Sequence, residues 1–328
     1  MQMQMIQQAE SAMKEGLPKI SVCTISFNHA HCIRDCINGV RTQKYGGEVQ
    51  HVISDDKSTD QTAKVIEESI REKSSVTYKI INQPENVGMN QNLIDALSAC
   101  DGEFIALCEG DDYWVHPAKL SRQVSQLMKN TEIAMATHEC YRIYYPPKKF
   151  RSLRRAAKMV YWDTKTYGLA GFFELLKARI RGRERFWAKD RCRLEADRKD
   201  IYQLADLLNG VWIQPFCSIL MRKKIVEPFI ESLRLSEGGH QLALLLGGVF
   251  GGINHDRRPM AVKRDQKSSV TLDEARKARS LKRNANIETN NYLKRYRSIL
   301  KYADSHQSDM IEQRIERYLN SFQMGRKR

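Results

Sequence analysis

The stretch FIALCEGDDYW, residues 104–114, carries the most information about fold and function in this chain. Its first five residues form a short apolar run, which predicts a buried strand. Glu109, Asp111 and Asp112 follow at once, so three carboxylates crowd the end of that strand. Like charges at close range disfavour each other's ionisation, and a hard divalent cation relieves the conflict because Mg²⁺ and Mn²⁺ prefer oxygen ligands. The stretch therefore predicts a metal site.

A second acidic cluster follows another strand-like run. Residues 48–54 predict a strand, and the sequence DDKSTD, residues 55–60, follows its end. A serine, threonine or aspartate of this turn can cap the helix predicted at about 61–72. Alone, the cluster would be explained as a turn and a helix cap. Together with the first cluster, it favours a site for a metal and a polar ligand.

Strand and helix patterns alternate through the N-terminal half. Strands are predicted at 20–26, 48–54, 76–82, 104–108 and 133–137, and helices at about 31–42, 61–72, 89–100 and 117–130. Regular β-α-β alternation predicts a parallel sheet covered by helices. Ligands of such sheets bind beyond the carboxyl ends of the strands, where Ser26 and both acidic clusters fall.

The remaining chain is less regular, and we divide the whole into five segments. They are an N-terminal extension (1–18), a first half-domain (19–145), a basic insertion (146–199), a second half-domain (200–270) and a C-terminal helical extension (271–328). The elements predicted after the insertion are a helix at 201–208 capped by Asp200, a strand at 215–221, a helix at 239–247, a strand at 260–263 and two helices within 272–323. A surface hairpin is expected at His255 and Asp256.

The composition indicates a globular cytoplasmic protein. Of 328 residues, 41% are hydrophobic, enough for a substantial core. The eight cysteines lack zinc-site spacing, and residues 1–18 lack the basic and apolar regions of a secretion signal. We therefore expect free thiols and a cytoplasmic location. No apolar run in the sequence reaches the length of a bilayer span.

The formal net charge of +15 is unevenly distributed. Residues 146–199 hold 17 Lys/Arg and 6 Asp/Glu (17 − 6 = +11), whereas residues 1–145 hold 14 and 19 (14 − 19 = −5). Residues 169–187 of the basic block form an amphipathic pattern. It predicts either a helix covering the core or a helix on an anionic membrane surface, peripheral to the inner face of the cytoplasmic membrane. The residues expected at that membrane or acceptor surface are Phe172, Phe173, Arg181, Arg183 and Trp187.

Taken in order, several motifs resemble those of family 2 glycosyltransferases, most closely the bacterial enzymes that build O-antigen, capsule and related surface polysaccharides. The matching pieces are ISVCTISFN (20–28), DDKSTD (55–60), ENVG (85–88) with Asn92, ALCEGDDYW (106–114), QPFCSILMR (214–222) and MAVKR (260–264). The resemblance implies an α/β fold of the GT-A, nucleotide-diphospho-sugar transferase type. That fold has a mostly parallel sheet flanked by helices, here with a C-terminal helical extension.

The resemblance also implies roles for individual residues. Those expected to bind a nucleoside-diphosphate sugar, in the first place a uridine diphosphate sugar, are Ser26, Asn28, Asp55, Asp56, Asn86, Gly88, Asn92 and Asp111. Glu109-x-Asp111 stands at the position of the family's metal-binding DxD motif, with Asp112 beside it, and is expected to hold Mn²⁺ or Mg²⁺. The acceptor is expected to be a glycan or a lipid-linked glycan, and transfer to proceed with inversion by direct displacement.

The general base departs from the family pattern. Related enzymes have an aspartate between the strand of residues 214–222 and the closing strand, and the matching position holds His240. A histidine can act as a base near neutral pH without a large pKa shift. Glu237 lies three residues earlier and can act directly or orient the imidazole. Both remain candidates, with His240 preferred, and a loss of activity is the third possibility.

Three rival functions follow from the same features. A sugar nucleotidyltransferase would share the architecture and the metal, but the turn after the first strand, SFNH (26–29), lacks the glycine-rich loop that it needs. A non-catalytic protein binding nucleic acid or another anion would fit the charge, but no nucleic-acid-binding motif is present, so we expect no nucleic-acid partner. A degenerate scaffold would fit the replaced aspartate.

Overall fold

The computed structural model describes residues 16–145, 199–210, 215–266 and 285–325. The predicted N-terminal extension lies almost entirely outside these residues, as does the basic insertion. The amphipathic segment 169–187, with its proposed membrane-facing residues Phe172, Phe173, Arg181, Arg183 and Trp187, therefore lies outside the described residues.

The N-terminal half is built as the alternation predicts. Strands β1 (Ile20–Ser26), β2 (Val49–Asp55), β3 (Val76–Asn82) and β4 (Phe104–Leu107) pair in parallel in the order β3-β2-β1-β4. The helices between them are α2 (Ile33–Arg41), α3 (Thr62–Ile70) and α4 (Met89–Ser98). Because all four strands run the same way, their carboxyl ends lie along one edge of the sheet.

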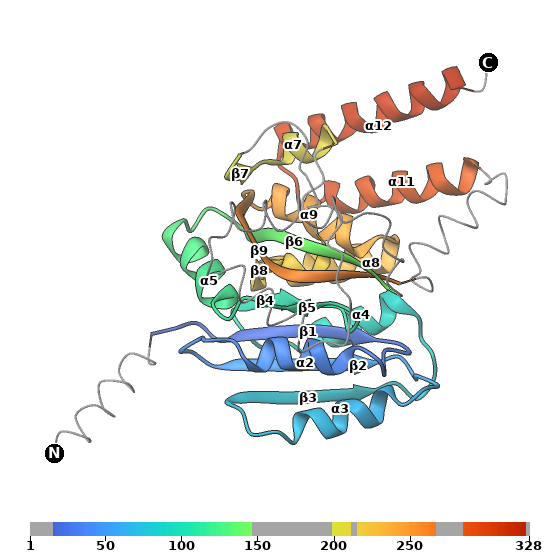
Figure 1. The fold of residues 1–328 in the computed structure, drawn as a ribbon. Helices are drawn as coiled ribbons and strands as arrows, with labels where there is room; N and C mark the ends of the chain where they lie inside the picture. Colours follow the sequence, from blue (N-terminus) through green and yellow to red (C-terminus); the bar gives the residue numbers. More distant parts are fainter. Residues whose placement is uncertain (1–15, 146–198, 211–214, 267–284, 326–328) are drawn as a thin grey trace, which may run out of the picture.

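The second half makes the sheet mixed. After α5 (Lys119–Lys129), the order continues from β4 through β8 (Leu220–Arg222), β6 (Met135–Tyr145) and β9 (Ile253–Gln266) to β5 (Tyr113–Trp114) (Figure 1). Strand β8 is antiparallel to both neighbours, β6 and β9 are parallel, and β5 is antiparallel to β9. Parallel pairing therefore dominates among β1 to β4, and the strand predicted at 260–263 is part of a much longer one.

Several local predictions in the second half are wrong. Instead of a helix over 201–208 capped by Asp200, the chain forms β7 (Ile201–Tyr202) against β9, then α7 (Leu204–Leu208). Gln203 caps α7 through a capping box with Asp206. The strand expected at 215–221 begins as the 3₁₀ helix η1 (Phe216–Ser218) before β8.

The predicted surface hairpin is also wrong. His255 and Asp256 are only 4% and 8% exposed inside β9. Asp256 accepts hydrogen bonds of 3.1 and 2.8 Å from the guanidinium of Arg122, so the carboxylate is buried with its counter-ion. After the turn η2 (Lys223–Ile225), α8 (Val226–Leu235) forms, which the sequence patterns did not predict.

Helices cover both faces of the sheet, and alternate residues of β1 show how. Val22 packs in a core with Ile37 of α2 and Leu120 of α5, whereas Cys23 packs in the other core with Leu97 of α4. The second core also contains α8 and α9 (Gly239–Val249), whose predicted position was 239–247. Each face of the sheet therefore has its own apolar layer.

The C-terminal residues form the two predicted helices, α11 (Ala285–Leu300) and α12 (Ser305–Gly325). They lie at the end of the molecule opposite β3 and α3 (Figure 1). Ile299 and Ile311 are fully buried in the core shared with α8 and α9, and Tyr292 stacks on Tyr318 with ring centroids 3.7 Å apart. Among the described helices, none combines the length and apolar character that a bilayer span requires.

Candidate functional site

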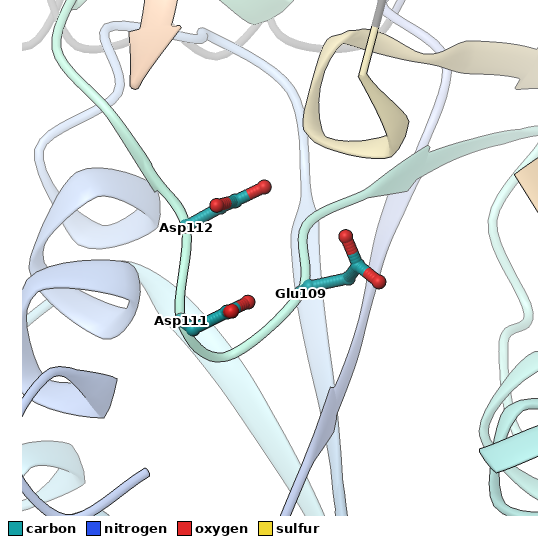
Figure 2. A group of neighbouring side chains, drawn as sticks. All are labelled: Glu109, Asp111 and Asp112. Carbon is teal, nitrogen blue, oxygen red and sulfur yellow. The ribbon is translucent and has the colours of Figure 1, made fainter. Parts of the chain in front are cut away.

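The acidic loop after β4 gathers three carboxylates. Glu109, Asp111 and Asp112 each offer an oxygen, and these oxygens lie within 4.8 Å of one another. Figure 2 shows the side chains of Asp111 and Asp112 projecting the same way from the loop that Glu109 opens. The backbone N–H of Asp112 donates to the carbonyl of Glu109 at 2.9 Å, which closes the loop into a turn. The predicted cluster therefore forms as one group.

The surroundings make this cluster costly without a cation. Asp112 is fully buried, and its Oδ2 atom has no hydrogen-bond partner. Burial raises the pKa of Asp112 well above its ordinary value, and burial also raises the pKa of Glu109. The charge of Asp111 raises both pKa values further, whereas Lys263 opposes the shifts. An orphaned carboxylate oxygen beside two more carboxylates fits a hard divalent cation such as Mn²⁺ or Mg²⁺.

Two basic residues of β9 face the acidic loop. Lys263 places its Nζ atom 4.0 Å from Oε2 of Glu109. The backbone N–H of Arg264 donates to Oδ1 of Asp112 at 2.8 Å, and its side chain donates to the carbonyl oxygen of Asp111 at 3.0 Å and pairs with Asp35. Burial alone lowers the pKa of Lys263, but the three carboxylates outweigh that effect and leave the pKa raised.

Sequence reasoning did not assign a role to either basic residue. MAVKR (260–264) was recognised only as the closing strand, because nothing local relates it to a loop about 150 residues earlier. The link depends on the β5–β9 pairing, in which Tyr113 lies opposite Val262. Strand β5 is two residues long, too short to be predicted from periodicity.

The loop after β2 is held by the carboxylate of Asp55. Ser26 and Ser58 donate to its Oδ1 at 2.7 and 2.6 Å, and the backbone N–H of Ser58 donates to Oδ2 at 2.9 Å. Asn28, with φ of 58°, accepts from the backbone N–H of Thr59 at 2.8 Å. The predicted nucleotide-pocket residues Ser26, Asn28 and Asp55 thus belong to one hydrogen-bonded unit that joins the ends of β1 and β2.

Asp56 joins this unit to the start of α4. Its carboxylate accepts from the backbone N–H of Val87 at 2.7 Å and of Gly88 at 3.1 Å, and Asn86 donates to its carbonyl oxygen at 3.1 Å. Gly88 has φ of 83°, which favours glycine. Asp56, Asn86 and Gly88 are therefore brought together as predicted.

Asn92 occupies a different environment from its neighbours. It is 1% exposed, and its carboxamide exchanges hydrogen bonds of 2.5 and 3.2 Å with the side chain and carbonyl of Ser54. Both ends of the amide are thus engaged inside the protein. These hydrogen bonds fix α4 against β2, and they thereby help to position the contact between Asp56 and Gly88.

The acidic loop packs directly against the end of β1. A Cβ atom at Gly110 would lie 2.8 Å from Nδ1 of His29 and 3.0 Å from Cβ of Ser26, so only glycine allows this approach. The Nδ1 atom of His29 is buried without a partner, and burial lowers the pKa of this histidine. His29 is a site residue that was not predicted. Through Gly110, the acidic loop and the loops after β1 and β2 share one edge of the sheet.

Of the two candidate bases, Glu237 lies on the link between α8 and α9, and His240 follows it in α9. Glu237 is exposed, and His240 is half-buried in the first turn of α9. Asn90 of α4 donates to the carbonyl oxygens of Leu233 and Ser236 at 3.3 and 3.2 Å, which fixes this link against the N-terminal turn of α4. The loop of Asp56 and the link that precedes His240 therefore both contact the start of α4.

The link is also held by the C-terminal helices. Arg295 of α11 donates to the carbonyl oxygen of Glu237 at 3.2 Å and to the side chain of Gln241. Gly238, with φ of 94°, leaves room for that guanidinium, because a Cβ atom there would lie 2.6 Å from Nη2 of Arg295. Arg295 is thus a further residue of this region that the sequence did not indicate.

Comparison with known proteins gives a consistent result. The family model described as glycosyl transferase family 2 matches residues 21–227. An uncharacterised protein of Mycobacterium tuberculosis is 37% identical over 140 residues, which cover 40% of each chain. The GalNAc(5)-diNAcBac-PP-undecaprenol beta-1,3-glucosyltransferase of Campylobacter jejuni is 28% identical over 96 residues, 29% of this chain and 30% of the other. The chain thus matches less than half the length of these relatives.

A solved structure extends the similarity to nearly the whole fold. S. aureus TarS (residues 1–349), in complex with UDP, superposes with a TM-score of 0.56 at 14% identity, covering 92% of this chain and 71% of that one. At this identity the match concerns the fold alone, and it confirms the predicted GT-A architecture.

Proposed function

Because the chain belongs to glycosyl transferase family 2, we propose that it transfers a sugar from a nucleoside-diphosphate sugar to a glycan or lipid-linked acceptor in the synthesis of a bacterial surface polysaccharide. The observation that carries this proposal is the group of Glu109, Asp111 and Asp112 beside the loops of Asp55 and Asp56. An anionic cluster of this kind suits a divalent cation and, through it, a diphosphate.

The residues of the site have distinct roles in the proposed reaction. Glu109, Asp111 and Asp112 would hold Mn²⁺ or Mg²⁺, which when bound neutralises charge on the leaving diphosphate. The unit of Ser26, Asn28 and Asp55, together with Asp56, Asn86 and Gly88, borders the nucleotide, and Asn92 supports it from within. UDP is the proposed nucleotide, supported by the fold similarity to a UDP complex.

The transfer step needs a base on the acceptor side. An acceptor hydroxyl attacks the anomeric carbon, its proton passes to the base, and the bond from that carbon to the diphosphate oxygen breaks. Attack opposite the leaving group inverts the configuration. We assign the base to His240, because a histidine can act as a base near neutral pH, with Glu237 as the alternative. Asn90 fixes against α4 the link that carries Glu237 and leads into His240.

The acceptor is proposed by analogy and charge. The C. jejuni relative is named for an undecaprenol-diphosphate-linked glycan. A lipid-linked diphosphate acceptor would also give a purpose to the 17 Lys/Arg residues within 146–199, which could bind anionic headgroups at the inner face of the cytoplasmic membrane. Co-sedimentation with anionic liposomes tests this part: charge reversal of Arg181 and Arg183 should weaken it, and equal binding would refute it.

A product assay tests the function itself. The full chain is incubated with Mn²⁺, a panel of UDP-, GDP- and dTDP-sugars and a lipid-diphosphate-linked acceptor. Acceptor-dependent release of the nucleoside diphosphate, abolished in Asp111→Asn, supports transfer. Release of pyrophosphate from a nucleoside triphosphate and a sugar phosphate would instead identify a nucleotidyltransferase. Folded protein without either activity would favour the non-catalytic alternative.

A further inference from the structure

A lysine from a distant strand stands among the carboxylates of the acidic loop. We propose that Lys263 is a permanent second cation of the donor site, which weakens binding of the bare metal ion and strengthens binding of the nucleoside diphosphate. The inference rests on the proposed metal site at Glu109, Asp111 and Asp112, and it assigns to Lys263 a positioning and affinity-setting role.

The position of Lys263 is set by the backbone. Strand β9 pairs antiparallel with β5, with Tyr113 opposite Val262, so the next pair in register would be Asp112 and Lys263. The hydrogen bond of 2.8 Å from the backbone N–H of Arg264 to Oδ1 of Asp112 fastens the strand at this point. The lysine therefore reaches the cluster from a fixed strand position rather than from a surface loop.

The lysine is also shielded from solvent. Its Nζ atom lies 4.0 Å from Oε2 of Glu109, and the two side chains are only 26% and 28% exposed. A charge pair in such surroundings is screened less than one on an open surface. The ammonium group consequently contributes to the electrostatic potential that any ion entering the cluster meets.

The net charge of the cluster explains why Lys263 should change metal affinity and nucleotide affinity in opposite directions. The three carboxylates carry −3 when ionised and Lys263 carries +1, so the cluster holds −2, which one divalent cation neutralises. The guanidinium of Arg264 is directed to Asp35 and the carbonyl of Asp111, so it is not counted here. A fixed positive charge repels an incoming metal ion and attracts an incoming diphosphate.

A purely structural role for Lys263 predicts something different. If the lysine only offset the buried carboxylates, its removal would lower the stability of the protein and change both ligand affinities in the same direction or not at all. Opposite changes in the two affinities cannot arise from partial unfolding, which weakens every ligand that binds the folded state.

Calorimetric titration of the full chain tests the inference. Wild type, Lys263→Met and Lys263→Gln are titrated with Mn²⁺ alone, and then with UDP, GDP and dTDP at saturating Mn²⁺. Removal of the ammonium should tighten Mn²⁺ binding about tenfold and weaken binding of the preferred nucleotide about tenfold. Lys79→Met is the matched control, because Lys79 lies exposed on β3, at the other end of the sheet order, and carries the same charge change.

The outcomes separate this inference from the proposed function. Wild-type binding of Mn²⁺ and a nucleotide, with both Lys263 variants unchanged or changed in one direction only, overturns the role of Lys263 and leaves the function standing. Equal shifts in Lys79→Met would assign the effect to net charge and also overturn it. Wild type that binds no Mn²⁺ overturns the metal centre, and the inference with it.

Discussion

The backbone N–H of Arg264 donates a 2.8 Å hydrogen bond to Oδ1 of Asp112, although 152 residues separate them in sequence. The side chain of Arg264, 1% exposed, continues the link by donating to the carbonyl oxygen of Asp111 and pairing with Asp35. The acidic loop is therefore held in place by the closing strand of the sheet. Its geometry depends on the whole domain being folded.

Arg264→Met should loosen the acidic loop. The substitution leaves the carbonyl oxygen of Asp111 without its donor and removes the partner of Asp35, so we expect a loss of roughly 1–3 kcal/mol in the free energy of unfolding. Mn²⁺ affinity should fall with it. Urea denaturation and Mn²⁺ titration measure both effects. Asp35→Asn, which removes only a half-exposed partner, should cost less than about 1 kcal/mol. Wild-type stability and affinity in Arg264→Met would contradict the link.

Asp112→Asn should stabilise the metal-free protein but remove its response to Mn²⁺. The change removes one of three neighbouring carboxylates while an amide oxygen can still accept from Arg264, so the metal-free protein should gain roughly 1 kcal/mol in stability. The rise in melting temperature that Mn²⁺ gives wild type should disappear. Thermal unfolding with and without Mn²⁺ measures both, with the exposed Asp101→Asn as control. An undiminished Mn²⁺ effect in Asp112→Asn would refute its assignment as a ligand.

Substitutions of the two candidate bases, His240 and Glu237, should differ in their effect on kcat. His240→Asn should lower kcat by about 10²- to 10⁴-fold with little change in the KM for the donor, because only proton removal from the acceptor is lost. Glu237→Gln should reduce kcat less. Steady-state kinetics with both substrates varied measures the split, and His306→Asn, an exposed histidine of α12, serves as the control. The reverse order of effects would make Glu237 the base.

Gly238→Ala should disturb the link between α8 and α9, next to both candidate bases. The residue has φ of 94°, and a Cβ atom would meet the guanidinium of Arg295. We expect a loss of about 1–2 kcal/mol in stability from the backbone conformation, together with a lower kcat. Gly210→Ala, with φ of 92° but open space around the Cβ position, should show the conformational cost without the displaced arginine. Equal kcat values for the two variants would argue against a role for the Arg295 contact.

Stability should fall in acid through buried histidines. Burial lowers the pKa of His51 from 6.5 to about 3, with its Nε2 atom 2.9 Å from Oγ1 of Thr24. Below pH 6.5 His51 binds a proton in the unfolded chain but stays neutral in the folded protein. The free energy of unfolding therefore decreases as pH falls from about 6.5 towards 3. This histidine alone contributes about 1.4 kcal/mol per pH unit in that range.

Chemical denaturation between pH 7 and pH 4.5 or so measures this effect. His51→Gln should lose stability less steeply than wild type over the interval. Burial also lowers the pKa of His255 to about 4. His255 therefore accounts for part of the pH dependence of stability that remains in His51→Gln. Identical slopes for wild type and His51→Gln would contradict the buried, neutral state of His51.

The N-terminal half could be predicted closely because its signals are local. Each strand is a short run rich in apolar and β-branched residues that ends at a polar turn, so β1 and β3 were predicted with their observed bounds and β2 within a residue. The carboxyl ends of parallel strands meet at one edge, which was enough to place Ser26, Asp55 and the acidic loop together.

The second half could not be predicted as well because its structure depends on distant pairing. His255 and Asp256 are polar and suggested a surface turn, but Arg122 neutralises Asp256 inside the sheet. The 14-residue strand β9 contains both, along with Arg257 and Arg258, so no apolar period marks it. Lys263 and Arg264 acquire their roles only when β9 reaches the acidic loop.

The most direct measurement is an anomalous diffraction map from crystals soaked with Mn²⁺ and UDP. We predict a manganese peak between the carboxylates of Asp111 and Asp112 and the UDP diphosphate, with the nucleotide beside Asp55 and Asp56. A map with UDP bound but no manganese peak at Asp111, or with neither ligand at this edge of the sheet, would contradict the proposed donor site.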